Sequence, residues 1–148
     1  MKKVILFGSG LVSFLFATTI HIPSPDYPTI QAGINASVDG DTVLVAQGTY
    51  PENLILANEI VLASHAIYDD LDSQWLDNDN INNTIISGAH SGSCLVVRDG
   101  NIQPTIIGLT FQDGVGTSMR VNNCSISKRE RSGGAILLYK AYPTIMYN

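Results

Sequence analysis

Five aspartates between residues 69 and 79 form the densest group of side chains that could do chemistry in this chain. They are Asp69, Asp70, Asp72, Asp77 and Asp79. Carboxylates interspersed with asparagine amides resemble the oxygen ligands of Ca²⁺, which binds about six to eight oxygens. The residues from Asp77 to Ile81 do not match an EF-hand loop, because Ile81 stands at the position of the third ligand and the glycine of that loop is missing. The segment therefore predicts either a calcium site of irregular spacing or a solvated acidic loop, and no other cofactor is expected.

Two aromatic residues in the same segment could bind sugar. Tyr68 and Trp75 carry rings that stack on pyranose faces when exposed, although a lone loop aromatic can also pack onto the strands beneath it. The three histidines (His21, His65 and His90) have no serine or cysteine at the spacing of a nucleophilic motif, so no triad is indicated. No catalytic residue is assigned.

The elements that must position these side chains are predicted to be short strands. They are rich in apolar and β-branched residues and bounded by Gly, Asn, Asp or Pro. We expect strands at 42–46, 54–56, 60–63, 84–87, 94–97, 106–111, 120–126, 135–139 and 144–147. The residues 65–83 between two of them read as a long polar loop. No second amphipathic helix follows the first, which argues against alternating βαβ units.

The segment from Pro28 to Tyr50 predicts the single helix. Ile30, Ile34 and Val38 recur on one helical face. Pro28 suits the first helical turn, and Gly40 suits the left-handed residue that ends the helix. The helix is expected to cover the first strand and close one end of the sheet structure.

This segment also resembles a known family. Gly40-Asp41, Gly48-Thr49-Tyr50 and Glu52-Asn53, with Thr84 to Gly88 and Gly133-Gly134 downstream, are similar to secreted right-handed parallel β-helix proteins of the pectate-lyase-like superfamily. The resemblance implies an all-β fold, a right-handed parallel β-helix (solenoid) with a short N-terminal capping α-helix. It implies no single activity, because the superfamily includes lyases, hydrolases and adhesins. Neither the carboxylate-and-base set of its lyases nor the aspartate set of its hydrolases has a matching motif here.

An internal repeat agrees with stacked strands. Ser91-Gly92 and the following Cys94 to Val97 recur as Ser132-Gly133 and Ala135 to Leu138, and Pro104-Thr105-Ile106 recurs as Pro143-Thr144-Ile145. A repeat of this length is typical of an array in which each unit packs on its neighbours. Because the chain stops at Asn148 inside such a unit, we expect further coils of the same chain beyond it.

The first residues predict export. Lys2 and Lys3 precede an apolar run from Val4 to Phe16, and small residues follow at Ala17 to Thr19. This pattern is typical of a cleaved signal peptide, with Ala17 as the expected cleavage position. We therefore divide the chain into a signal peptide (1–19) and an exported part (20–148), comprising the N-terminal cap and first coils. The expected location is extracellular or on the cell surface, with no membrane span after signal removal.

Charge and composition narrow the possible partners. The chain carries a formal net charge of −5, and removing Lys2 and Lys3 makes it more acidic. An acidic surface disfavours nucleic acid, since phosphate binding needs a basic face. The leading hypothesis is a surface scaffold or adhesin-like module, without catalysis in this segment, whose partner is a polysaccharide or cell-surface glycan. The alternatives are the N-terminal part of a polysaccharide lyase or glycoside hydrolase acting on acidic polysaccharide, and a carbohydrate-binding module.

Overall fold

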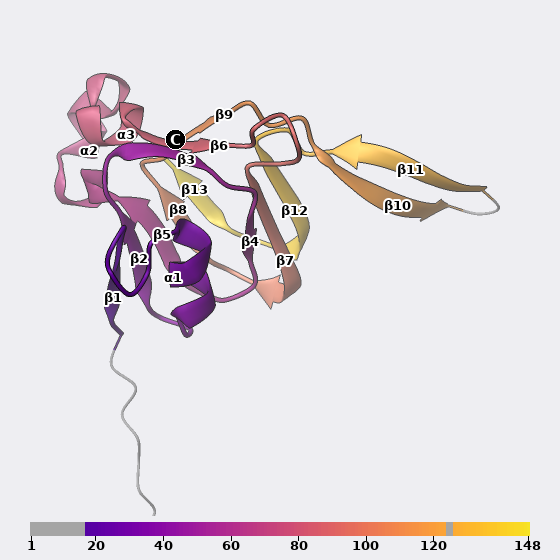
Figure 1. Cartoon of the computed structure of the whole chain (residues 1–148), viewed down its shortest axis with the longest axis horizontal. Helices are drawn as coiled ribbons and strands as arrows, with labels where there is room; N and C mark the ends of the chain where they lie inside the picture. Colours follow the sequence, from indigo (N-terminus) through magenta and orange to yellow (C-terminus); the bar gives the residue numbers. More distant parts are fainter. Residues whose placement is uncertain (1–16, 124–125) are drawn as a thin grey trace, which may run out of the picture.

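The computed structural model describes residues 17–123 and 126–148, and it places most strands in three parallel sheets (Figure 1). The largest sheet has the order β1 (Thr19–Ile22), β2 (Thr42–Val45), β5 (Val61–Ser64), β8 (Thr105–Ile107) and β13 (Thr144–Met146). A second sheet contains β4 (Leu54–Leu56), β7 (Leu95–Ile102) and β12 (Ile136–Ala141), with β7 in the middle. The third contains β3 (Gly48–Pro51), β6 (Thr84–Ser87) and β9 (Thr110–Gln112).

The predicted fold class is wrong. Instead of an all-β solenoid, the described chain is a mixed structure with several short parallel sheets, one antiparallel sheet and five helical segments. The antiparallel sheet is the hairpin of β10 (Thr117–Asn123) and β11 (Ile126–Ser132), which projects from the body in Figure 1. Two of the four later helical segments begin at a local side-chain cap, Ser64 or Asn78, in residues expected to form a loop.

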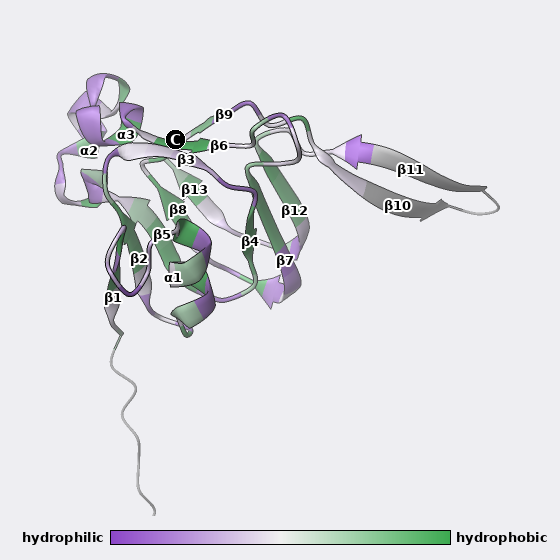
Figure 2. Ribbon diagram, in the orientation of Figure 1, coloured by the Kyte–Doolittle hydropathy of each residue, from purple (hydrophilic) through white to green (hydrophobic). Residues whose placement is uncertain are grey.

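Rows of apolar side chains across paired strands make the core, which Figure 2 colours green along the strands. One row runs through Val43, Leu62 and Ile106, all fully buried, and another joins Leu54 to Leu95. Each buried leucine or isoleucine stabilises the fold by roughly 1.5–3 kcal/mol. The pairing register thus converts short strands, each too small to bury its side chains alone, into one continuous core.

The predicted helix is present as α1 (Ile30–Ala36). Its N-cap is Thr29, so Pro28 precedes the helix instead of lying in its first turn. Ile30 and Ile34 are buried as expected, but Val38 is half exposed, since Ser37 ends the helix by bonding the Ile34 carbonyl.

A close approach brings α1 onto β1 and β2. A Cβ built on Gly33 would lie 2.7 Å from Ile22 Cδ1 and 3.3 Å from Val43 Cγ1, so only glycine fits without displacing a neighbour. Gly40 has the predicted left-handed backbone, with φ of 92°, but α1 already ends at its C-cap Ser37, so Gly40 turns the chain without ending the helix. The chain then reverses into β2, and α1 lies between β2 and β4 in Figure 1.

The acidic segment 65–83 folds into four short helical pieces. These are η1 (His65–Tyr68), α2 (Leu71–Gln74), η2 (Trp75–Asp77) and α3 (Asp79–Asn82). Ala66 and Ile81 are buried and anchor the segment, while most of its other side chains face solvent. The exposure agrees with the prediction of a polar segment, whereas the helical backbone does not.

The strand predictions are confirmed at 54–56 and 84–87, which coincide with β4 and β6. The predicted strand 106–111 is divided into β8 and β9 because Gly108, with φ of 67°, turns the chain between them. The internal repeat predicts the observed pairing, since Leu95 lies opposite Ile136 and Thr105 opposite Thr144.

The two cysteines and the expected signal peptide are only partly covered by the described residues. Cys94 is buried, and burial raises the pKa of its thiol, but Cys124 lies outside the described ranges. Most of the expected signal peptide also lies outside them, although Thr19 belongs to β1. Among the helices in the described ranges, none has the length and apolar character needed to cross a bilayer.

Candidate functional site

The predicted carboxylates are spread through the segment 65–83, and two of them organise it. Asp69 Oδ2 accepts hydrogen bonds from the side-chain amides of Asn78 and Asn80, both at 2.9 Å. These two bonds, with a smaller contribution from the charge of His65, lower the pKa of Asp69. Asp70 accepts a bond from the Ser73 hydroxyl at 2.7 Å. These carboxylates therefore tie the helical turns together.

The other acidic residues are arranged separately. Asp72 Oδ1 accepts a bond from the Tyr147 hydroxyl at 2.5 Å, which raises the pKa of that tyrosine. Asp77 lies in η2 and Asp79 in the first turn of α3, both exposed. Within the described part of the chain, no three His, Cys, Asp or Glu side chains form a group that could hold a metal ion. The calcium site stays an untested prediction.

The two predicted sugar-binding aromatics have different neighbours. Tyr68 is 69% exposed and packs edge-on against the His65 ring, with centroids 6.3 Å apart. Trp75 is 39% exposed and lies tilted against Tyr147 at 6.5 Å. The Tyr147 contact joins this segment to the residues after β13, and the sequence-based reasoning did not include it.

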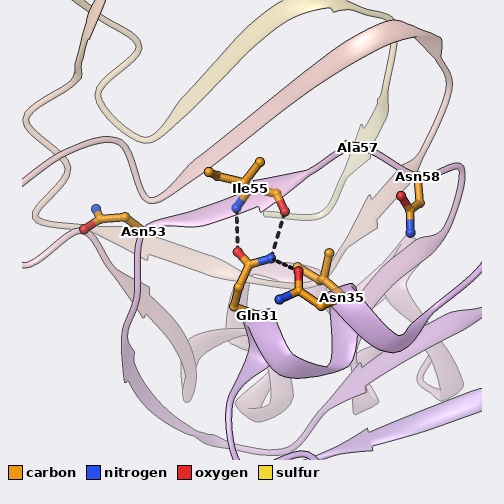
Figure 3. A pocket seen from close by; sticks show the side chains of 7 residues that line it. Gln31, Asn35, Asn53, Ile55, Ala57 and Asn58 are labelled. Carbon is orange, nitrogen blue, oxygen red and sulfur yellow. Dashed lines mark hydrogen bonds between the residues drawn. The ribbon is translucent and has the colours of Figure 1, made fainter.

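A groove that the sequence analysis missed lies between α1 and the open edge of β4 (Figure 3). It has a volume of about 620 Å³. Side chains from the helix line one side, and residues of β4 and the following turn line the other. They are Gln31, Ile34, Asn35, Asn53, Ile55, Ala57 and Asn58. The lining has no charged side chain and four amides.

Gln31 holds the two sides of the groove together. Its Oε1 accepts a bond from the Ile55 backbone N–H at 2.8 Å, and its Nε2 donates to the Ile55 carbonyl at 3.1 Å (Figure 3). Nε2 also donates to Asn35 Oδ1, one helical turn away. The side-chain amide thus bonds Ile55 as a neighbouring strand's peptide would, at the edge of a sheet in which β4 is the outer strand.

The Glu52-Asn53 pair, quoted above only for its family resemblance, has a local role. The two carboxylate oxygens of Glu52 accept bonds from the N–H groups of Ile30 and Gln31 at 3.0 Å each. A carboxylate at the start of a helix satisfies donors that have no partner within the helix. Glu52 therefore fixes α1 beside β4, and this position sets the width of the groove.

Asn53 and Asn58 differ in how many of their side-chain hydrogen-bonding groups remain free to bind a ligand. Asn53 is fully engaged, since it donates to the Gly88 and Ser93 carbonyls and accepts from the Ser91 hydroxyl. Asn58 donates to the Ser37 carbonyl at 2.9 Å. Its Oδ1, like the Nδ2 of Asn35, makes no hydrogen bond with the described residues. One donor group and one acceptor in the groove lining are thus without a partner among the described residues.

The groove residues had a weak signal in the sequence. Gln31 and Asn35 are polar residues separated by one helical turn, a spacing that lets their side chains meet. Nothing in the spacing predicted that β4 would lie against them.

Comparisons with known proteins assign no family. No protein-family model, no curated protein and no solved structure matches this chain.

Proposed function

We propose that this chain is an exported, adhesin-like scaffold module that binds a neutral glycan in the groove between α1 and β4 and does not transform it. The observation that carries the proposal is the pair of uncommitted amide groups, Asn35 Nδ2 and Asn58 Oδ1, beside the exposed side chain of Ile55. Sugars present hydroxyls that donate and accept, together with apolar C–H faces. An amide donor and an amide acceptor next to an aliphatic side chain match both features.

The absence of charge in the groove lining favours a neutral sugar over an acidic one. Glu52 lies nearby, but its two oxygens are engaged by the N-terminus of α1. A uronate would place its carboxylate among amides with no cation to pair with it, at a desolvation cost. This argument selects a neutral polysaccharide partner and makes acidic polysaccharide the alternative to be tested.

The sheets support the groove in the way that a scaffold requires. The Asn53 side chain bonds Gly88 and Ser93, which precede β7, and β4 pairs with β7 in register. Binding residues supported by packed strands lose little conformational freedom when a ligand arrives. Thr18 supports the export part of the proposal, because its backbone N–H donates to Asp41 at 2.8 Å. Cleavage after Ala17 would place a charged amino terminus against that carboxylate.

The test is calorimetric titration of the purified chain with hexasaccharides of glucose, mannose and galactose, and with oligogalacturonate as the acidic probe. We expect binding to at least one neutral sugar. Because a single neutral hydrogen bond contributes about 0.5–1.5 kcal/mol, Asn35→Ala and Asn58→Ala should each weaken it by roughly two- to tenfold. Gln74→Ala is the matched control, since Gln74 is an exposed amide on α2.

Two results would overturn the proposal. One is binding to oligogalacturonate alone, unaffected by either asparagine variant. The other is release of unsaturated or reducing products from any of these sugars, which would make the chain part of a lyase or hydrolase.

A further inference from the structure

A second pocket lies where the outward face of the β4–β7–β12 sheet meets the base of the β10–β11 hairpin. Its volume is about 230 Å³. Residues of β7 and β12 form one part of the lining, and the first two residues of β10 form the other. They are Val96, Arg98, Asp99, Leu137, Tyr139, Thr117 and Ser118. This pocket shares no lining residue with the groove between α1 and β4.

The floor of the pocket is apolar. Val96 and Leu137 are direct partners across the parallel pairing of β7 and β12, so they lie side by side on the same face. Leu137 is only 8% exposed, although the equivalent position on β4, Ile55, is 40% exposed. The hairpin base shields this part of the sheet face and turns it into a recess of a size suited to one apolar side chain.

The rim carries cationic and aromatic groups. Arg98 Nε lies 3.1 Å from Asp99 Oδ2, and the Arg98 side chain is 47% exposed. Its two terminal amino groups make no hydrogen bond with the described residues and can bind a second, bidentate partner. The Tyr139 ring, 44% exposed, lies 5.5 Å from Lys140 Nζ. Arg98 is the cation and Asp99 the carboxylate of the pocket lining, and Lys140, outside that lining, adds a second positive charge beside Tyr139.

The backbone explains how these groups are gathered. The pairing of β7 with β12 shifts register between Tyr139 and Ala141, and Asp99 and Lys140 both have left-handed backbones, with φ of 75° and 52°. A bulge of this kind bends a strand and re-aims the side chains beside it. Arg98 and Tyr139, which are partners in the register, are the last regular residues before the bulge.

We propose that this pocket binds the C-terminus of a peptide that ends in an apolar residue. The Arg98 fork takes the terminal carboxylate, and the last side chain enters the recess above Val96 and Leu137. Ser118, at the base of the hairpin, lines the same pocket and offers a hydroxyl to the peptide backbone. A uronic acid would satisfy Arg98 but would bring hydroxyls onto an apolar floor, so the lining favours the peptide.

The experiment measures fluorescence anisotropy of an N-terminally labelled pentapeptide ending in leucine, with a free carboxylate or with a C-terminal amide. We expect the amide to bind at least about tenfold more weakly, because hydrogen bonds to charged groups are the strong ones. Arg98→Gln should weaken the free-acid peptide by a similar factor and leave the amide unchanged. The affinity of Arg98→Lys for the free-acid peptide should lie between those of the original chain and Arg98→Gln, since lysine keeps the positive charge but not the two parallel N–H donors of the guanidinium.

Asp99→Asn is the matched variant for which tighter peptide binding is expected. Asparagine tolerates the left-handed backbone at this position, and the change removes the competing carboxylate. We therefore expect the free-acid peptide to bind about two- to fivefold more tightly. Equal binding of acid and amide peptides, weaker binding to Asp99→Asn, or displacement of the peptide by galacturonate but not by acetyl-leucine would each overturn the proposal.

Discussion

Replacing Gln31 by alanine tests the claim that a side-chain amide completes the open edge of β4. The change removes both bonds to the Ile55 backbone and the bond to Asn35. The site is partly exposed, so water replaces some of what is lost. At about 0.5–1.5 kcal/mol for each of the two Ile55 bonds, we expect the free energy of unfolding to fall by about 1–2 kcal/mol. With a urea m-value of about 2 kcal/mol/M, the midpoint should fall by roughly 0.5–1 M.

Two further variants separate this role from a general effect on α1. Asn35→Ala removes only the bond between the two side chains, which is exposed, and should cost less than about 0.5 kcal/mol. Gln31→Glu has nearly the same helix propensity but places a carboxylate oxygen against the Ile55 carbonyl. Protonation restores a donor there, so the folded-state pKa of the introduced carboxyl is raised. The free energy of unfolding of Gln31→Glu should therefore be closest to that of the original chain at acid pH. The difference should grow as pH rises through that pKa.

The assay is urea unfolding followed by circular dichroism, together with light scattering for self-association. An open strand edge invites pairing with another chain, so Gln31→Ala should also associate more readily. An unfolding midpoint within about 0.1 M of the original chain, without added association, would refute the role assigned to Gln31.

Three other predictions follow from single groups. The Thr84 hydroxyl is buried and has no hydrogen-bond partner in the described structure, so Thr84→Val should raise the free energy of unfolding by about 1 kcal/mol in urea titrations; a loss of stability would contradict this. Hydrogen bonds from the backbone N–H groups of Val38 and Thr18 lower the pKa of Asp41 in the folded state. The contribution of Asp41 to the free energy of unfolding is therefore present above about pH 4 and disappears as pH falls through this lowered pKa. Asp41→Asn should flatten the acid limb of the stability profile, and an unchanged limb would exclude this linkage. N-terminal sequencing of the exported protein should begin at Thr18, and a start inside β1 would contradict the proposed cleavage.

Local patterns predicted α1 and most strands because their determinants are near in sequence. Ile30 and Ile34 share a helical face, and Gly40 provides the left-handed turn. The internal repeat matches Leu95 with Ile136, and these two residues lie opposite each other in the pairing of β7 with β12. The end of α1 was misjudged because two bonds stop the helix there: Ser37 bonds the Ile34 carbonyl, and Asp41, from beyond the turn, accepts the N–H of Val38.

The fold class and the candidate groove depended on contacts that the sequence does not display. The acidic segment looked like a loop because its carboxylates and amides are polar, yet Asp69 bonds the side chains of Asn78 and Asn80 and so connects the helical pieces. The groove depends on Gln31 reaching Ile55 in a different element. Such pairs form only once the sheets place α1 against β4, so composition and spacing could not reveal them.

The binding of a neutral glycan between α1 and β4, as proposed above, can be followed by NMR through the side-chain amide signals of the groove. During titration with the neutral hexasaccharide that binds, the Asn35 and Asn58 side-chain NH₂ signals and the Ile55 backbone N–H signal should shift together. The Trp75 indole signal should stay in place. Shifts confined to Trp75 and Tyr68, or no shift at Asn35 and Asn58 at saturating sugar, would show that the glycan does not bind in this groove.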